Sequence, residues 1–412
     1  MNSVFFSKKV PSVKSVLSKS YLNIKSDALV SSAHLKFYKN GIFQKTNRSS
    51  KQRSLSPQFK QALVICDKKF QSSPLLKNWK KNKQFKFYYL KSGEQSKSLE
   101  CLPQHIKKIN SLISDFDKSS LLFIGLGGGS IIDLTGFLAS IYKRGIPVVF
   151  IPSTWLSALD SAHGGKNALN FKGIKNLLGT YHFPKAIYII EELLKQNPKN
   201  LEQQAYGELL KIAFIKGGNF YKSLRQSILA NFKNSNKRVV HSAFSIKKFL
   251  QTAIEAKMAI VKKDPFENKI ERKKLNLGHT VGHVLEASQS LPHGIAVLYG
   301  LLFSLNWSYH KAFLSKKNYE EMKSLILLKL FDLSFTTLNT FIGINSKKNN
   351  KKLNKNIKKI PLSLFKSYLR QDKKHKEGFK IEFIFIQKPG KVFFKTVLEK
   401  ELIQEAKRQS FL

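Results

Sequence analysis

Residues 121–130 read Leu-Leu-Phe-Ile-Gly-Leu-Gly-Gly-Gly-Ser, and this stretch decides the predicted fold. Its apolar start predicts a short buried strand that runs into a glycine-rich turn. Residues 131–143 then space their apolar side chains as a helix does, Gly145 ends that helix, and 147–151 (Pro-Val-Val-Phe-Ile) begin another strand. A strand, a glycine turn, a helix and a second strand form a βαβ unit, the building block of a parallel sheet.

The glycine turn over residues 125–130 is a candidate phosphate site. Backbone N–H groups of such a turn, together with the N-terminus of the following helix, bind anions. The full dinucleotide fingerprint is absent, because Ser130 replaces its last glycine and no acidic residue follows about twenty positions later. A tight turn that needs glycines with positive φ is the alternative interpretation.

The pattern on either side of this unit predicts an α/β fold. Residues 62–66 (Ala-Leu-Val-Ile-Cys) form an apolar run that ends at Asp67, and 86–90 form another. After about residue 197 the chain consists of long, Lys-flanked helical segments with few strands. We therefore expect a Rossmann-like α/β domain over 61–197, followed by a mainly α-helical domain over 198–412.

Two segments fall outside this pattern. Residues 1–60 are rich in Ser and Lys and hold one acidic residue, Asp27. We interpret them as a divergent N-terminal segment, with a targeting peptide as the alternative. Residues 345–359 are almost entirely Lys and Asn, which predicts a disordered loop.

The composition of the chain is strongly basic. Its 412 residues carry 72 Lys and Arg against 26 Asp and Glu, a formal charge of +46. Such a charge is typical of nucleic-acid binders. The lysines are spread along the whole chain rather than gathered in a patch, which favours a solvated surface whose field attracts anionic substrates.

The cysteines and the apolar runs indicate in which cellular compartment the protein is expected. Cys66 and Cys101 are the two cysteines, too few for a disulfide framework or a Cys-rich zinc site, and we predict two core thiols in a reducing compartment. The longest apolar run, about 294–307, is too short to cross a bilayer and predicts a buried helix. We expect a cytoplasmic protein without a membrane partner; an organelle is the alternative if 1–60 include a transit peptide.

A pair of histidines is the strongest candidate for a metal site. Residues 276–283 read Asn-Leu-Gly-His-Thr-Val-Gly-His, so His279 and His283 lie four apart on one helical face. His293 follows, and Glu208 in a predicted helix offers a carboxylate. Three protein ligands and an open position make a catalytic zinc site. The alternatives are histidines that pack or cap and a solvated helix charge at Glu208.

A second motif places lysines beside glycines. Residues 160–166 read Asp-Ser-Ala-His-Gly-Gly-Lys, and Lys175 and Asn176 follow. A turn with two glycines allows lysine ammonium groups to converge on an anion.

Taken together, these motifs resemble the 3-dehydroquinate synthase family of sugar-phosphate cyclases. The match runs in the family's order from Asp67 to Gly378. It includes Gly93-Glu94…Lys97, the Gly127–Gly129 turn with Asp133, Arg144-Gly145, Pro152-Ser-Thr154, Asp160…Lys166, Lys175-Asn176, Glu208…Lys211, Lys257, Arg272…Asn276-Leu-Gly-His279…His283, His293-Gly294 and Asp372-Lys-Lys374.

The resemblance implies an NAD-binding α/β domain and a metal-binding helical domain, with the active site in the cleft between them. It implies that the metal ion, Zn or Co, is held by Glu208, His279 and His293. It implies that NAD is surrounded by Asp67, Glu94, Lys97, Gly127, Gly128, Gly129, Asp133, Ser153, Thr154 and Lys175. It implies that the substrate is surrounded by Arg144, Asp160, Lys166, Asn176, Lys211, Lys257, Arg272, Asn276, His283 and Lys374.

The implied reaction is the second step of the shikimate pathway. The family converts 3-deoxy-D-arabino-heptulosonate 7-phosphate to 3-dehydroquinate and phosphate by oxidation at C5, elimination of phosphate, return of the hydride and an aldol ring closure. Arg and Lys suit the phosphate and carboxylate of this anionic sugar phosphate. We expect His283 to transfer or position a proton. A homodimer is also implied, and a nucleic-acid partner is not expected.

The chain departs from the family's pattern at a few positions. Ile132 stands where glycine is usual, Asn167 where Thr is common and Ile295 where an acid is common, and His163 and Phe183 are also unusual. None of these replaces an implied metal ligand, but neighbours of ligands influence their orientation.

Three other functions fit parts of the sequence. Another sugar-phosphate cyclase would share the metal and NAD, and Arg144, Lys175-Asn176, Arg272 and Asn276 favour the dehydroquinate pattern over it. A metal- and NAD-dependent alcohol dehydrogenase of glycerol type would release NADH, and the anion-binding lysines and arginines argue against it. A nucleic-acid-binding protein without activity would have lost site residues, whereas the motifs are complete.

Overall fold

The computed structural model describes residues 3–12, 16, 37–39, 59–233, 245–333, 358–371, 375–376 and 380–412. The chain divides into two units, Met1–Pro198 and Lys199–Leu412. The predicted loop 345–359, apart from its last two residues, lies outside the described residues, and so does Lys374.

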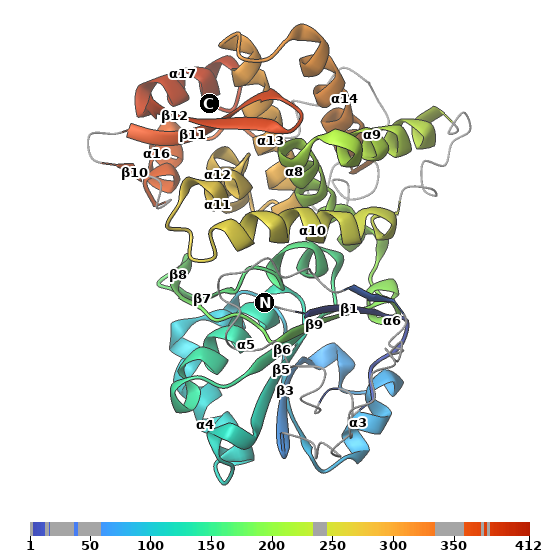
Figure 1. Ribbon diagram of the computed structural model, residues 1–412. Coiled ribbons are helices and arrows are strands. Elements are labelled where there is room, and N and C mark those ends of the chain that lie inside the picture. The colour runs from blue at the N-terminus through green and yellow to red at the C-terminus, as the bar shows by residue number, and fades with distance from the viewer. Residues whose placement is uncertain are drawn as a thin grey trace. The chain divides into compact units, whose positions relative to one another are not determined.

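The first unit contains a parallel sheet (Figure 1). Its strands in the described residues lie in the order β2-β1-β9-β6-β5-β3-β4, and every neighbouring pair is parallel. The predicted strands and the βαβ unit are confirmed. These strands are β1 (Ser3–Ser7), β2 (Phe37–Lys39), β3 (Gln61–Asp67), β4 (Phe85–Leu90), β5 (Leu121–Gly127), β6 (Val148–Pro152) and β9 (Ala186–Ile190).

The strands β3, β5, β6 and β9 consist of near-continuous apolar runs. Such runs are expected inside a parallel sheet, because its strands are covered on both faces. Every residue of these four strands is buried. Alternate residues such as Val64 and Ile124 join Trp79 in one core cluster. The helix α5 (Gly129–Ile141) packs against β5, β3 and β6, and it covers the predicted 131–143 helix except for its last two residues.

Residues 3–7, in the predicted divergent segment, form a strand of this sheet. Val4 of β1 is fully buried, and Phe5 stacks on Tyr188 of β9 with ring centroids 5.0 Å apart. The segment therefore contributes to the core of the first unit. Cys66 is buried as predicted, but the prediction for Cys101 is wrong: this residue is only partly buried, at the start of α4 (Leu102–Ile113).

An antiparallel hairpin of β7 (Lys166–Phe171) and β8 (Ile174–Tyr181) packs on α5. The remaining helical segments of the unit are short turns and small helices: η1 (Lys68–Phe70), η2 (Pro74–Leu76), α3 (Lys77–Lys81), η3 (Gln95–Lys97), η4 (Leu99–Cys101), η5 (Lys118–Ser120), η6 (Tyr142–Arg144), η7 (Ser157–Ser161) and α6 (Glu191–Lys195).

The second unit is mainly helical, as predicted. Its central helix α13 (His293–His310) contains the apolar run 294–307, and it packs against α8, α12 and α14. The helices are α7 (Lys199–Gln204), α8 (Tyr206–Lys216), α9 (Gly218–Lys233), α10 (Lys247–Lys263), α11 (Ile270–Lys273), η8 (Lys274–Asn276), α12 (His279–Gln289), α13, α14 (Lys316–Leu333), α16 (Leu362–Gln371) and α17 (Glu399–Arg408).

A small antiparallel sheet completes this unit. It consists of β10 (His375–Lys376), β11 (Lys380–Lys388) and β12 (Lys391–Leu398). Phe383 and Phe385 of β11 pack their rings on Trp307 of α13 at centroid distances of 4.6 and 5.1 Å. Among the described residues, no helix is both long and apolar enough to cross a membrane.

Candidate active site

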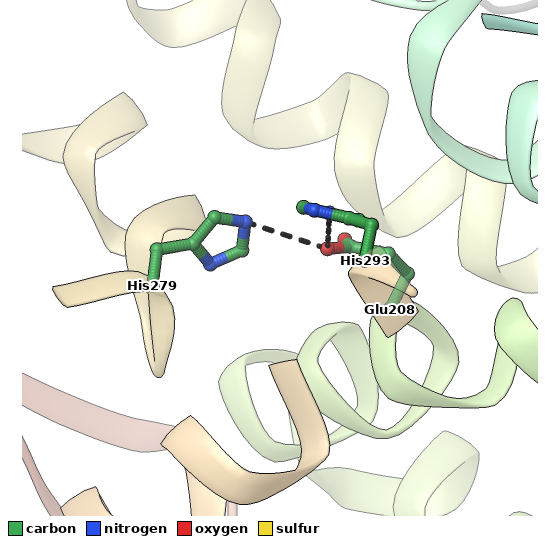
Figure 2. A group of neighbouring side chains, drawn as sticks. All are labelled: Glu208, His279 and His293. Atoms are coloured by element: carbon green, nitrogen blue, oxygen red, sulfur yellow. Dashed lines mark hydrogen bonds and ion pairs between the residues drawn. The ribbon is translucent and has the colours of Figure 1, made fainter. Parts of the chain in front are cut away.

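The second unit brings one carboxylate and two imidazoles together (Figure 2). Glu208 lies in the first turn of α8, while His279 and His293 are the first residues of α12 and α13. Glu208 Oε1 lies 3.5 Å from His279 Nε2 and 3.3 Å from His293 Nε2. The candidate ligand atoms of the three residues all lie within 4.8 Å of one another. This donor set fits a divalent cation such as zinc or cobalt.

The second nitrogen of each ring has an acceptor that fixes the orientation of the imidazole. His279 Nδ1 lies 3.2 Å from Leu277 O, and His293 Nδ1 lies 2.9 Å from Glu286 Oε2. A ring that donates its Nδ1–H directs the Nε2 lone pair to the opposite side, as metal-bound histidines do. Both Nε2 atoms face the Glu208 carboxylate.

Charge is concentrated around the fully buried Glu208 side chain. Lys211 Nζ, one turn later in α8, forms an ion pair with Glu208 Oε2. Burial would by itself lower the pKa of His293, but its hydrogen bonds and its attraction to Glu208 and Glu286 raise that pKa to about 10. The carboxylates therefore attract a positive charge to this position.

Glycines allow the three ligands to meet. Gly207 precedes Glu208 and Gly294 follows His293, and a Cβ on Gly207 would lie 2.1 Å from Gly294 O. A Cβ on Gly294 would lie 1.5 Å from Gln204 O. The backbones of α7, α8 and α13 thus approach more closely than any side chain would permit.

A second glycine contact places α12. Gly278, which precedes His279, has φ +79°, and its carbonyl oxygen would lie 1.8 Å from a Cβ on Gly300 of α13. His279 thereby begins its helix against the middle of α13. His283, one turn later, is exposed, and its ring centroid lies 5.0 Å from that of His279.

The other expected substrate residues of this unit differ in burial. Lys257 on α10 and Arg272 on α11 are buried at 6% and 4% exposure. The Arg272 guanidinium donates to Pro265 O, and Asn276 Nδ2 lies 3.4 Å from Glu267 Oε1. Lys374 lies outside the described part of the chain.

The expected nucleotide residues of the first unit follow the carboxyl ends of its strands. The chain passes from β3 to β4 on one side and then to β5 on the other, so the strand order reverses between β3 and β5 (Figure 1). Ligands of open parallel sheets bind at such a reversal. Asp67 ends β3 and Gly127 ends β5, one step beyond the Cys66–Leu126 pair.

The structure corrects the alternative interpretation of the glycine turn, in which its glycines are needed for positive φ. Gly125, Gly127, Gly128 and Gly129 are all described, and each has a φ outside the left-handed region, so positive φ does not explain them. A Cβ on Gly127 would instead lie 2.6 Å from the Ile131 side chain. The glycines therefore provide space at the N-terminus of α5, where unpaired N–H groups attract anions.

The residues after β6 line the same edge. Ser153 N donates to Gly127 O at 2.8 Å, and the buried Ser153 hydroxyl has no hydrogen-bond partner among the described residues. Thr154 and Ser157 exchange hydrogen bonds that cap the segment leading to Asp160. A buried hydroxyl without a partner beside a glycine turn fits a site for a polar ligand.

A buried lysine connects two expected sites. Lys97, 2% exposed, donates from Nζ to Asp133 Oδ2 and to Asn176 Oδ1, both at 2.6 Å. Burial raises the pKa of the Asp133 carboxyl, and the Lys97 ammonium opposes that shift. Asp133 and Lys97 were expected beside NAD, and Asn176 beside the substrate.

The hairpin and the end of α5 carry the remaining residues of the unit. Lys166, Lys175 and Asn176 are exposed on the β7–β8 hairpin. Arg144 is different: it follows α5 and precedes β6, and its carbonyl accepts a hydrogen bond from Lys118, just before β5. Because β5 and β6 are parallel, Arg144 lies at the amino edge of the sheet, opposite the glycine turn.

The departures from the family pattern are mostly packing residues. Ile132, His163, Asn167 and Ile295 are all buried. Asn167 fits against Gly136 of α5, where a Cβ would lie 1.6 Å from Asn167 Oδ1.

Two residues that take part in these clusters were missed in the sequence. Glu286 is two helical turns from His279 and contacts His293; its spacing from His279 was the available signal. Asn170 on β7 contacts Glu94 and Asn176, and it had no distinctive signal.

The fold and the ligand cluster define the class. A 2-epi-5-epi-valiolone synthase from Streptomyces hygroscopicus matches with a TM-score of 0.67 and 18% identity over 90% of this chain and 100% of that chain. A 2-deoxy-scyllo-inosose synthase matches with a TM-score of 0.64 and 20% identity over 86% and 91%. The chain thus has the fold of the sugar-phosphate cyclases.

The sequence comparisons identify the family within this class. The 3-dehydroquinate synthase N-terminal model matches residues 87–204 and the C-terminal model matches 205–359. The 3-dehydroquinate synthase of Pyrobaculum aerophilum is 33% identical over 319 residues, 77% of this chain and 82% of that protein. The chain belongs to the 3-dehydroquinate synthase family, and it is a carbon–oxygen lyase that acts on a phosphate ester.

Proposed function

We propose that the chain forms 3-dehydroquinate and phosphate from 3-deoxy-D-arabino-heptulosonate 7-phosphate, with NAD and one divalent metal ion as cofactors. The observation that carries the proposal is the Glu208, His279 and His293 cluster, in which both imidazoles direct Nε2 toward one buried carboxylate.

The metal ion is held by these three side chains. Glu208 supplies negative charge, and the bonds from the two Nδ1 atoms to Leu277 O and Glu286 keep the Nε2 lone pairs available. When bound, the cation supplies Lewis acidity to oxygens of the substrate. Zinc is supported by the 2-epi-5-epi-valiolone synthase, solved with NAD+ and Zn2+, and cobalt by the 2-deoxy-scyllo-inosose synthase, solved with Co2+.

NAD is held at the carboxyl edge of the sheet in the first unit, where it supplies a hydride acceptor and donor. The Gly127–Gly129 turn and the N-terminus of α5 bind its phosphates. Asp67, Glu94, Lys97 and Asp133 follow adjacent strands and bind its polar groups together with Ser153, Thr154 and Lys175.

The substrate is bound by cationic and amide side chains. Lys166, Lys211, Lys257 and Arg272 neutralise its phosphate and carboxylate, and Asp160, Asn176 and Asn276 accept or donate hydrogen bonds. Lys374 is proposed for the same role. His283 is exposed beside His279, which suits a group that moves a proton at the substrate. The carbaglucose-6-phosphate bound to the 2-deoxy-scyllo-inosose synthase supports a sugar-phosphate substrate.

We further propose a homodimer in the cytoplasm without a nucleic-acid partner. Arg144 supports the dimer, because it lies at the sheet edge opposite the glycine turn. An Arg144 that contacts substrate therefore comes from a second copy of the chain.

The test is release of inorganic phosphate. Purified chain with NAD and zinc or cobalt releases phosphate from 3-deoxy-D-arabino-heptulosonate 7-phosphate and forms 3-dehydroquinate, without net accumulation of NADH. Glu208→Ala and His279→Ala lose metal and turnover while they still bind NAD. A folded, metal-loaded chain that releases no phosphate, or that accumulates NADH, would refute the proposal.

A further inference from the structure

Asn170 occupies a special position in the β7–β8 hairpin. The pairing of the two strands shifts between Leu169 and Phe171, so Asn170 lies at a bulge. Its backbone forms an isolated bridge with Ser98, directly after η3. Only 8% of the residue is exposed, so its amide must be satisfied inside the protein.

Both ends of the Asn170 amide bind site residues. Asn170 Nδ2 donates to Glu94 Oε2 at 2.7 Å and to Glu94 O at 3.2 Å. Asn170 Oδ1 accepts the backbone N–H of Asn176 at 3.0 Å. The Asn170 side chain thus connects a residue proposed to bind the nucleotide with the backbone of a residue proposed to bind the substrate. Lys97 connects the side chains of the same two residues, since its Nζ lies 3.9 Å from Glu94 Oε2 and donates to Asn176 Oδ1.

Glu94 and Asn176 are both restrained by these contacts, and both remain exposed to solvent. Asn176 has φ +55°, and its side chain is held by Lys97 at 2.6 Å, so its backbone and its side chain are fixed by different residues. The Glu94 side chain is 48% exposed, which leaves its carboxylate accessible to a ligand hydroxyl. Lys97 also contacts Asp133 on α5, which anchors the cluster to the helix that follows the glycine turn.

We propose that Asn170 is a positioning residue that couples nucleotide binding at Glu94 to substrate binding at Asn176. The proposal rests on the proposed function of the two sites. A nucleotide that draws the Glu94 carboxylate into one orientation fixes the Asn170 amide, and the amide fixes the Asn176 backbone. The first ligand thereby orders the binding site of the second, which gives positive coupling.

The experiment is a calorimetric titration of NAD into the metal-loaded full-length chain, with and without a phosphonate analogue of the substrate that cannot release phosphate. In the parent protein the analogue lowers the dissociation constant of NAD about fivefold or more, which is the lower end of typical coupling between sites. In Asn170→Ala the ratio of the two NAD dissociation constants falls by about twofold or more, and the contacts of Lys97 with Glu94 and Asn176 keep the rest of the coupling. Asn170→Asp keeps the acceptor for the Asn176 N–H but places a second carboxylate against Glu94. This variant therefore weakens the binding of NAD more than it weakens the binding of the analogue.

Asn167→Ala is the matched control. Asn167 lies on the same strand, is also buried and donates two hydrogen bonds, to Gly165 O and His182 O, but it forms no hydrogen bond with Glu94 or Asn176. This variant keeps the coupling. The inference is overturned if Asn170→Ala keeps the coupling, if Asn167→Ala loses it too, or if the parent protein binds both ligands without coupling. A parent protein that binds no NAD refutes the proposed function instead.

Discussion

The ring of His293 depends on a carboxylate outside the ligand set. Glu286 Oε2 lies 2.9 Å from His293 Nδ1, while Nε2 faces Glu208 at 3.3 Å. The ring therefore lies between two carboxylates, one that would share the cation and one that orients the imidazole. Without Glu286, the ring loses both its preferred tautomer and part of its basicity.

Glu286→Ala is therefore expected to weaken metal binding by about 10- to 100-fold, the usual cost of removing such a partner. Glu286→Gln keeps an acceptor oxygen without the charge and falls between the parent and Glu286→Ala. Metal affinity is measured by competition with a chelator of known affinity. Glu320→Ala, an exposed carboxylate on α14, is the control with unchanged affinity. Equal affinities for Glu286→Ala and Glu320→Ala would contradict this role.

The site depends on how closely α8, α12 and α13 approach one another. The three ligands lie next to Gly207, Gly278 and Gly294, and each of these glycines faces the backbone of another element. The separation of these backbones sets the separation of the ligand atoms. A change in the packing of these helices therefore changes the geometry of the metal ligands.

Gly207→Ala tests this dependence. Its Cβ would lie 2.1 Å from Gly294 O, and backbone cannot yield as a flexible side chain does. We expect α8 and α13 to separate, a loss of about 1–3 kcal/mol or more in the stability of the second unit, and at least tenfold weaker metal binding. NAD binding, proposed for the first unit, is unchanged. Metal affinity equal to that of the parent would show that the helices can adjust without moving the ligands.

The sequence predicted elements better than contacts between them. Strands β3 to β6 and the helix α13 were predicted from apolar runs, because those runs reflect burial. The strand order, and the place of residues 3–7 beside β9, depend on pairing between distant segments, which periodicity does not encode. Glu286 and Asn170 are polar residues like many others in the chain, and only tertiary contacts distinguish them.

The formal charge of +46 makes each proton that the chain binds unfavourable. In two histidines of the first unit, burial disfavours the charged form of the imidazole. His105 Nε2 lies 2.8 Å from Ser96 O and therefore donates, so Nδ1 accepts the hydroxyl of Tyr88, also at 2.8 Å. His182 Nε2 lies 2.8 Å from Ile146 O. Burial lowers the pKa of both imidazoles, although their backbone hydrogen bonds oppose the shift.

The sign of the resulting pH dependence follows from these pKa shifts. Below the ordinary histidine pKa of 6.5, the unfolded chain binds protons that the folded first unit excludes. The stability from His105 and His182 is therefore full above that pH and is lost as the pH falls, by at most about 1.4 kcal/mol per pH unit for each histidine.

His105→Gln retains a donor for Ser96 O and an acceptor for Tyr88 but does not titrate. Urea unfolding at about pH 7.5 and pH 5.5, followed by tryptophan fluorescence, should show a smaller loss of stability for this variant than for the parent. An equal acid-induced loss in both proteins would mean that His105 does not contribute to the pH dependence.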